Sequence, residues 1–295
     1  MRLRLRYTKR GKIRFTSHRD TARVWERTVR RAQLPIAYSQ GFSPHAKLSF
    51  GLALSTGFES DAEYLDIELD QARADVDVAA LPSMLSGLLP DGMTVSAVAV
   101  LPVGAPSLQQ IVTSCEYVID LSIDDFVAPD TVGALGERVA LAVARVNAAD
   151  SVFVARERKG VVRNDDIRPA ILALEYQSDG MVRLRAELAA QPKAVRPSEL
   201  LAALAVDAVA RVRRTHQWTL LEGLRSEPLR ADQFGDVAGS VAASSAGTFA
   251  AAGAVMGRCS PDHHAGTTAL VSAVREEFFD VRSRGLRLDR LRQAN

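Results

Sequence analysis

The fold is decided first by residues 2–33, which read RLRLRYTKRGKIRFTSHRDTARVWERTVRRAQ. Arginine alternates with leucine or tyrosine from Arg2 to Tyr7, and this period of two predicts a β-strand with one buried face. Lys9–Lys12 predicts a turn, after which Ile13–Phe15 continues the alternation. The stretch therefore predicts an opening strand that carries its arginines on one face.

An amphipathic helix is predicted next. Ser17 offers its hydroxyl as an N-cap, with Asp20 three positions later, and the helix runs to about Gln33, before Pro35. The side predicted to face a sheet carries Ala22, Trp25, Val29 and Ala32. The other side gathers, within a sector of about 120°, the arginines Arg19, Arg23, Arg27, Arg30 and Arg31.

The order of predicted elements indicates the fold class. After the helix, strands are predicted at Lys47–Leu54, Glu63–Leu69 and Met93–Leu101, with a helix at Val78–Leu89. A similar order recurs with strands at Glu116–Ser122, Ser151–Arg158, Ala170–Gln177, Met181–Ala189 and Arg211–Leu221, and helices at Asp130–Val146 and Pro197–Leu204. The βαββαβ order is that of a ferredoxin-like unit. We therefore predict an α+β fold of two tandem ferredoxin-like domains, residues 1–104 and 105–224.

Residues 225–295 are predicted to be a flexible, largely disordered tail. Of the 20 residues Ala238–Gly257, 15 are Ala, Gly or Ser, which is typical of a linker and too weakly apolar for a membrane span. One short helix is predicted at Ala269–Asp280. With no apolar signal segment near Met1, we expect a cytoplasmic protein with no membrane partner.

Charge is distributed unevenly along the 295 residues. The net charge is +2, yet residues 1–50 hold 13 Lys and Arg against 2 Asp and Glu, a net of +11, and residues 51–224 carry a net of −10. A strongly basic end points to a polyanionic partner, either a nucleic acid such as RNA or another polyanion. The two cysteines form no CxxC or Cys/His pattern, so no metal and no cofactor is predicted.

The candidate phosphate-binding side chains lie in this basic end. Guanidinium forks offer paired donors to phosphate oxygens, and the candidates are Arg4, Arg6, Lys9, Arg10, Lys12, Arg19, Arg23, Arg27, Arg30, Arg31 and Lys47. Ser17, at the start of the helix, is a candidate phosphate contact. In the loop before Lys47, Phe42 and Ser43 are candidate RNA contacts, with Phe42 stacking on a base. The same loop also fits a tight structural turn with Phe42 packed inward. Further along, Arg211, Arg213 and Arg214 extend the basic surface.

Catalytic candidates are few. His18 and His45 could act as acid and base in RNA cleavage, with Lys47 stabilising the phosphorane. His18 is, however, predicted on the apolar side of its helix beside Trp25, and no third group orients either ring. We therefore expect the protein to bind RNA without cleaving it.

Several motifs resemble the radical-SAM-linked family of uncharacterised bacterial proteins over about residues 1–222. The motifs are Lys12–Asp20, Arg30–Ala32, Leu34-Pro35, Ala37–His45, Lys47–Phe50, Ala105–Leu108, Asp166–Pro169 and Arg196–Leu201. Members of that family are often fused to, or encoded beside, a radical-SAM enzyme, and in actinobacteria their genes lie near ribonuclease E/G. The resemblance implies an accessory domain in RNA modification or processing, with such an enzyme as partner. It supplies no catalytic residues.

Three functions follow as hypotheses. The first is an accessory RNA-binding module that presents RNA to a partner enzyme. The second is a metal-independent RNA-processing enzyme that uses His18 and His45. The third is a protein–protein adaptor whose basic face meets an acidic partner.

Overall fold

A computed structural model describes residues 1–236 except 71–75, 123–131, 159, 179, 207, 222 and 231–233. All of these residues belong to one compact unit, Met1–Ser244. The predicted tail beyond residue 236, with its helix at Ala269–Asp280, lies outside the described residues. The tail was predicted to begin at residue 225, and this boundary is wrong, because residues 224–226 and 234–236 form strands.

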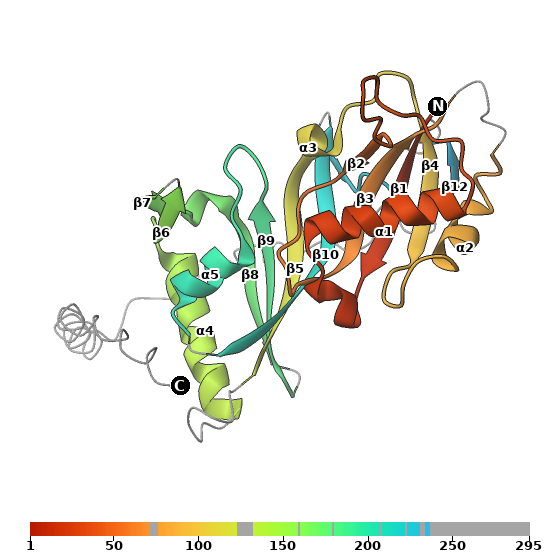
Figure 1. Cartoon of the computed structure of the whole chain (residues 1–295). Helices are drawn as coiled ribbons and strands as arrows, with labels where there is room; N and C mark the ends of the chain where they lie inside the picture. The colour runs from red at the N-terminus through yellow and green to blue at the C-terminus, as the bar shows by residue number, and fades with distance from the viewer. Residues whose placement is uncertain are drawn as a thin grey trace, which may run out of the picture. The chain divides into compact units, whose positions relative to one another are not determined.

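The chain has a mixed α+β fold built on one large sheet (Figure 1). Its described strands are β1 (Arg2–Lys9), β2 (Leu48–Phe50), β3 (Glu59–Glu68), β4 (Val95–Leu101), β5 (Val112–Ser122), β8 (Ile171–Ser178), β9 (Val182–Ala189), β10 (Val209–Leu221), β11 (Leu224–Ser226) and β12 (Phe234–Asp236). Their order is β12-β4-β1-β3-β10-β5-β9-β8, with β2 paired to β3 and β11 paired to β10. A separate hairpin joins β6 (Phe153–Arg158) to β7 (Val161–Asp166).

Two stretches of this sheet share a local strand order. β1 lies between β4 and β3, with β2 on the far edge of β3, and all three pairings are antiparallel. β5 lies between β10 and β9, with β8 outside, again antiparallel. The stretches are continuous, because β10 pairs in parallel with β3 through Arg213 and Arg214. The structure therefore shows one mixed sheet with the same order on both sides of the β3–β10 pair.

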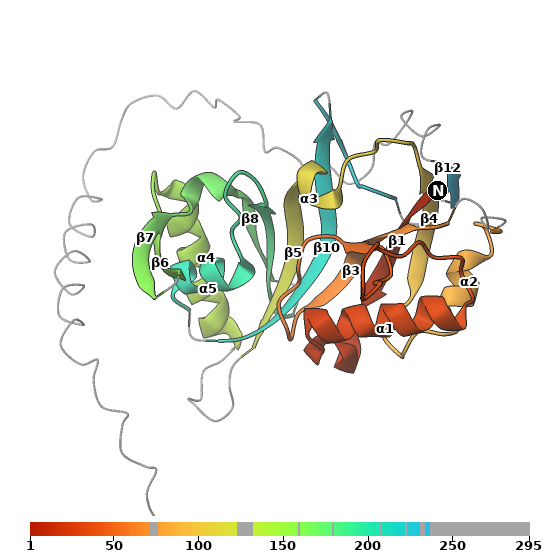
Figure 2. The same ribbon diagram turned by 45° about the horizontal axis from the view of Figure 1, so that its top comes forward.

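The helices cover the sheet at two places (Figure 2). They are α1 (His18–Arg31), α2 (Leu81–Ser86), α3 (Leu108–Ile111), α4 (Val132–Ala148) and α5 (Pro197–Leu204), with 3-10 turns η1 (Gly11–Phe15) and η3 (Arg168–Ala170). Trp25 of α1 is fully buried, and its ring meets that of Tyr7 edge-on at 4.9 Å. Val29 is buried beside it, which confirms the predicted sheet-facing side of the helix. The α4 helix packs against β8 and β9 in a second core.

The segment Ile13–Phe15 is not the strand that its alternation predicted. It belongs to η1, which begins at Gly11 with φ +66. An L-residue rarely adopts this left-handed backbone, so the glycine turns the chain out of the sheet. The Thr16 N–H then donates to the Ile13 carbonyl and closes the turn before α1.

The face of β1 that carries its arginines is covered, which corrects the predicted half-buried strand. Leu229 is 1% exposed and packs in a small core, whose other members are Ala62, Tyr64, Ala97, Ala99 and Leu108. The Tyr64 hydroxyl donates to the Leu229 carbonyl at 3.2 Å. Residues near 229 therefore close the side of the first stretch that lies opposite α1. Within the described part of the chain, no helix is both long and apolar enough to cross a membrane.

Candidate nucleic-acid interface

The α1 helix starts at the predicted cap. The Ser17 hydroxyl accepts a hydrogen bond from the Asp20 N–H at 3.1 Å and donates to the Asp20 carboxylate at 2.7 Å. Hydrogen bonding from Ser17, with the nearby charge of Arg23, lowers the pKa of Asp20. The Ser17 hydroxyl has one hydrogen to donate, and it donates that hydrogen to Asp20, so in this arrangement it has no donor left for the predicted phosphate contact.

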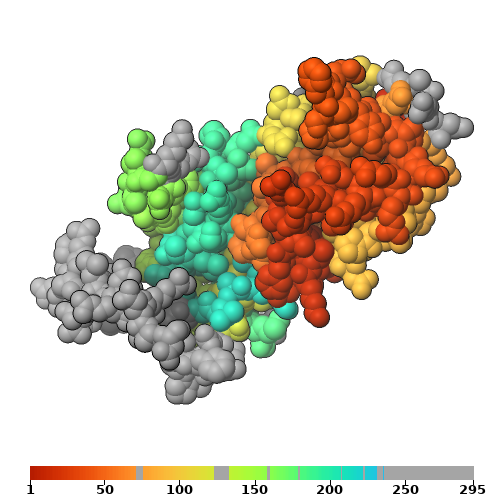
Figure 3. Space-filling model, viewed as in Figure 1, coloured from red at the N-terminus to blue at the C-terminus, as the bar shows by residue number. Residues whose placement is uncertain are grey.

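All five predicted arginines of α1 are exposed: Arg19, Arg23, Arg27, Arg30 and Arg31. Arg23 pairs with Asp20 at 3.2 Å, but both side chains are about half exposed, and such surface pairs contribute little. Among the described residues, no carboxylate pairs with the other four. Figure 3 shows α1, in red, as a ridge across one face of the molecule. The ridge presents guanidinium groups whose donors are open to an anion.

The η1 turn adds cations and an exposed aromatic ring. Lys12 is exposed, and Arg10 pairs with Asp61 at 2.5 Å while remaining half exposed. The Phe15 ring is 61% exposed, and the Arg14 guanidinium lies 4.4 Å from its centroid. Neither Arg14 nor Phe15 was predicted as a site residue, because the alternation of Ile13–Phe15 predicted a strand there. The left-handed Gly11 was the signal for a turn that exposes them.

The loop before β2 projects Phe42 into solvent. Phe42 is fully exposed, and Ser43 and His45 are exposed beside it. The loop is nevertheless ordered by its backbone, since Ser39 and His45 exchange hydrogen bonds of 2.9 and 3.0 Å. The loop is thus a closed turn, but the alternative in which Phe42 packs inward is wrong.

Three predicted phosphate contacts are buried instead. Arg4 donates two hydrogen bonds to Asp66, at 2.7 and 2.9 Å, and is 3% exposed. Arg6 pairs with Glu227 at 3.1 Å. The Lys9 ammonium donates to the Thr16 carbonyl at 2.9 Å.

The reason is the covering of β1 on both faces, which places these cations inside the protein. Their charge is matched by carboxylates and a carbonyl rather than by an external anion. Lys47 differs from them because it remains exposed, although its ammonium lies 2.9 Å from Glu68.

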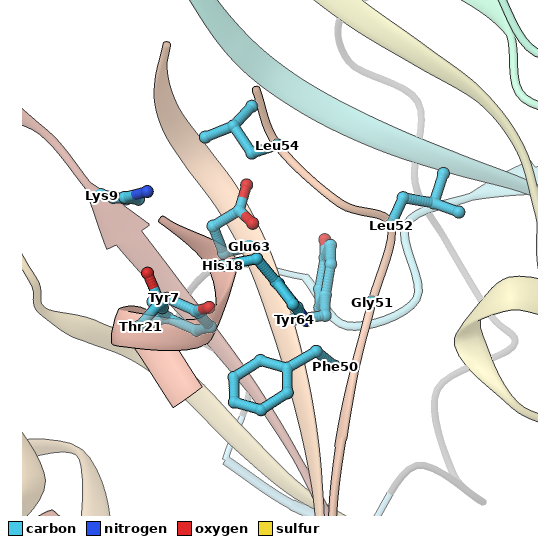
Figure 4. A pocket seen from close by; sticks show the side chains of 10 residues that line it. All are labelled: Tyr7, Lys9, His18, Thr21, Phe50, Gly51, Leu52, Leu54, Glu63 and Tyr64. Atoms are coloured by element: carbon cyan, nitrogen blue, oxygen red, sulfur yellow. The ribbon is translucent and has the colours of Figure 1, made fainter. Parts of the chain in front are cut away.

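A small hollow lies at the start of α1 (Figure 4). Its volume is about 20 Å³, room for about one water molecule. His18 lines this hollow and is exposed, although it was predicted on the apolar side of the helix. The His18 ring meets Phe50 of β2 edge-on at 5.2 Å. Lys9 and Glu63 also line the hollow, and burial lowers the pKa of Lys9.

Glu63, which lines this hollow, forms a buried ion pair with Arg214. The Arg214 side chain is 1% exposed and also donates to the Leu52 carbonyl at 2.9 Å. Its predicted place on the basic surface is therefore wrong. The strand alternation placed it with Arg211 and Arg213, but Arg213 and Arg214 are sequence neighbours and point to opposite faces. Glu63 was not a predicted site residue.

The structure does not bring the three catalytic candidates into one cavity. His18 lines the hollow at the start of α1, whereas Lys47 lines a different one with Arg2 and Glu68. His45 lines neither and lies on the exposed loop. In the part of the chain that the structure describes, no cluster of three or more His, Cys, Asp or Glu could hold a metal ion.

Comparison with known families gives one clear match. Residues 2–197 match the family described as "Uncharacterized protein conserved in bacteria (DUF2344)". The chain belongs to this family. The DUF2344 match includes η1, α1 and the Phe42 loop, but its description names no radical-SAM enzyme, so that association is not shown.

Other comparisons add little to the DUF2344 assignment. No curated protein matches the chain. Among solved structures, the chain is similar to one in "Crystal Structure of a Cbf5-Nop10-Gar1 Complex", with 11% identity and a TM-score of 0.39. The match covers 73% of this chain and 48% of that one, about half its length. At this TM-score, the likeness carries no argument about function.

Proposed function

We propose that this protein is an accessory RNA-binding module that presents RNA to a partner enzyme. The observation that carries the proposal is the exposed row of arginines on α1, which has one acidic partner, Asp20, among the described residues. The buried Arg4 is neutralised inside the protein by Asp66. The arginines of α1 are exposed, and their guanidinium groups are therefore available to an external anion.

The geometry of α1 suits a nucleic-acid backbone. With a rise of about 1.5 Å per residue, Arg19 and Arg31 lie about 18 Å apart along the axis. A row of that length can follow several phosphates, and the exposed cations Arg10, Lys12 and Lys47 lie on the chain segments before and after α1. Phosphate contacts of this kind supply affinity without sequence selection.

Exposed aromatic rings favour single-stranded RNA over a duplex. Phe15 and Phe42 are exposed on the chain segments before and after α1, and Ser43 lies beside Phe42. Proteins recognise unpaired RNA by stacking its bases on aromatic rings and guanidinium planes. A loop or an unpaired end is therefore the substrate class that we assign to this surface.

The finer parts of the proposal rest on the strand order and the resemblance. Both stretches of sheet have the fourth-first-third-second order of a ferredoxin-like unit, so we infer two such units fused through β3 and β10. The resemblance to the radical-SAM-linked family makes a radical-SAM enzyme or ribonuclease E/G the proposed partner. His18 and Lys47 line different cavities, and we do not propose a catalytic role for them or for His45.

A triple variant tests the proposal. Arg23→Ala/Arg27→Ala/Arg30→Ala removes three exposed cations from α1, and Arg138→Ala/Arg163→Ala/Arg196→Ala removes three exposed cations elsewhere. Binding of a single-stranded RNA is measured by fluorescence anisotropy from low to high salt. For single strands the slope of log K against log salt falls by about 0.7 per lost contact, so the α1 variant should lose about 2.

The control variant should keep the wild-type slope, because it has the same net charge as the α1 variant but an intact ridge. Equal slopes for the two variants would show that overall charge, not α1, attracts the RNA. If the wild type binds no RNA but retains an acidic protein in a salt-dependent way, the adaptor hypothesis replaces this one.

A further inference from the structure

A stack of three planar groups stands on the sheet face opposite α4. The rings of His216 and Trp218 lie parallel, 9° apart in plane and 5.0 Å between centroids. The Arg225 guanidinium lies 4.0 Å from the centroid of the Trp218 ring. His216 and Trp218 come from β10 and Arg225 from β11, which pair in the sheet. Two strands thus build one ladder of flat side chains.

Two carboxylates hold this ladder in position. Glu116 accepts a hydrogen bond from the Trp218 indole N–H at 3.2 Å and lies 3.0 Å from the His216 Nδ1. Glu187 accepts from Arg225 at 2.8 Å and from the Ser114 hydroxyl at 2.6 Å. Burial opposes the ionisation of Glu116, but hydrogen bonding from His216 and Trp218 holds its pKa below the usual range. The planes are therefore pre-organised by charged acceptors.

A groove of about 470 Å³ begins at the ladder. It is lined by the planar groups of Trp218 and Arg225, by the carboxylates of Asp166 and Glu187, and by apolar side chains, among them Pro169, Leu172, Pro192 and Leu220. The volume lies in the usual range for small-molecule sites, about 300–1,000 Å³. Lys193 stands at the rim and pairs with Asp165 at 3.1 Å.

The groove has features that internal packing does not explain. Leu172 and Leu220 are each more than half exposed, and about a third of the Arg225 side chain is open to solvent. The core of this half of the sheet lies on the other face, under α4 and α5. A flat cation beside exposed apolar side chains is complementary to a planar, electron-rich ring with an anionic substituent.

We propose that this groove binds a nucleobase, which stacks on the Arg225 guanidinium as the next layer of the ladder. The cations Arg225 and Lys193 then lie close to the phosphate that the nucleoside carries. The base belongs to a free nucleotide or to RNA, and in the second case the inference rests on the proposed function. It is a site separate from the α1 ridge.

Tryptophan fluorescence of the full chain tests this site. Trp25 is fully buried, so a ligand in the groove changes the emission of Trp218. The probes are AMP, a six-nucleotide oligoadenylate and ribose 5-phosphate, which has the sugar and phosphate without the base. AMP or oligoadenylate should quench the emission at concentrations at which ribose 5-phosphate leaves it unchanged. Equal quenching by all three probes would overturn base stacking.

Two variants locate the ligand. Arg225→Lys keeps the charge but removes the plane, and a stacked base is worth enough that affinity should fall on the order of tenfold. The control Arg211→Lys makes the same change at an exposed arginine that does not line the groove. Leu172→Asp places a charge in the groove at an exposed position and should abolish quenching without unfolding the protein. Wild-type affinity in both groove variants would overturn the inference.

The outcomes separate this site from the α1 ridge. The α1 triple variant should lose its salt-dependent RNA binding and keep the quenching by AMP. If the protein binds RNA but no probe quenches its emission, the groove proposal is contradicted and the proposed RNA-binding function is not. Quenching by AMP with no RNA binding supports the groove as a free-nucleotide site and contradicts the proposed function.

Discussion

The arginines of β1 and those of α1 lie within the same 31 residues and have opposite environments. Arg4 and Arg6 of β1 are buried and paired with Asp66 and Glu227. Arg27 and Arg30 of α1 are exposed, and no described carboxylate pairs with either. The net charge of the segment includes both sets of arginines and does not distinguish buried from exposed ones. The difference teaches that a basic segment contains both internal ion pairs and a surface for an anion, and that burial separates them.

The two sets differ because their charges are solvated differently. A buried cation loses its hydration and depends on its partner, so removal of that partner leaves an uncompensated charge. An exposed cation keeps its hydration, and its removal leaves nothing unsatisfied. Replacing a buried arginine should therefore lower stability, whereas replacing an exposed arginine should leave stability unchanged and weaken RNA binding.

The largest expected effect is on stability. Arg4→Ala leaves Asp66 buried without its two hydrogen bonds and should lower the free energy of unfolding by about 3–5 kcal/mol. Arg27→Ala should change it by no more than about 0.5 kcal/mol. Urea denaturation followed by circular dichroism measures both values.

A double variant sharpens this test. Arg4→Met/Asp66→Leu replaces the ion pair by apolar side chains and should be more stable than Arg4→Ala, because no buried charge is left unpaired. If Arg4→Ala and Arg27→Ala cost the same, the division of the arginines by burial is contradicted.

An intermediate effect is expected for an exposed aromatic ring. Phe42→Ala removes a fully exposed ring from the loop beside Lys47. One stacked base is worth about 1–3 kcal/mol, so RNA affinity should fall about 5- to 150-fold with unfolding unchanged. The matched control Phe153→Ala removes a 64% exposed ring from β6 and should leave RNA affinity as it is. Equal affinities of the two variants would remove Phe42 from the interface.

The smallest effect concerns the cap that orients the α1 arginines. Ser17→Ala removes the acceptor of the Asp20 N–H, and loss of an N-cap costs about 1 kcal/mol of stability. It also removes the main cause of the lowered pKa of Asp20, which should rise toward its usual range in an NMR titration. Since the folded pKa is depressed, the contribution of Asp20 is present above about pH 4 and lost as the pH falls. An unchanged Asp20 titration in Ser17→Ala would contradict this assignment.

Local order could be predicted from the sequence alone, because it depends on neighbours in the chain. The alternation in Arg2–Tyr7 predicts β1, and the Ser17–Asp20 pair predicts the start of α1. The spacing of Trp25 and Val29 predicts which side of that helix is buried, and hence that the arginines opposite are exposed.

The tertiary structure alone decided which polar groups are covered, because this depends on segments far apart in the chain. Glu227 pairs with Arg6 of β1 from more than 200 positions away, and Glu63 reaches Arg214 through the β3–β10 pair. The ladder of Trp218 and Arg225 likewise needs β11 to return beside β10. The period of the sequence shows that a strand has a buried face. Which segment covers that face depends on strand pairing between residues far apart in the chain, so a local pattern does not reveal it.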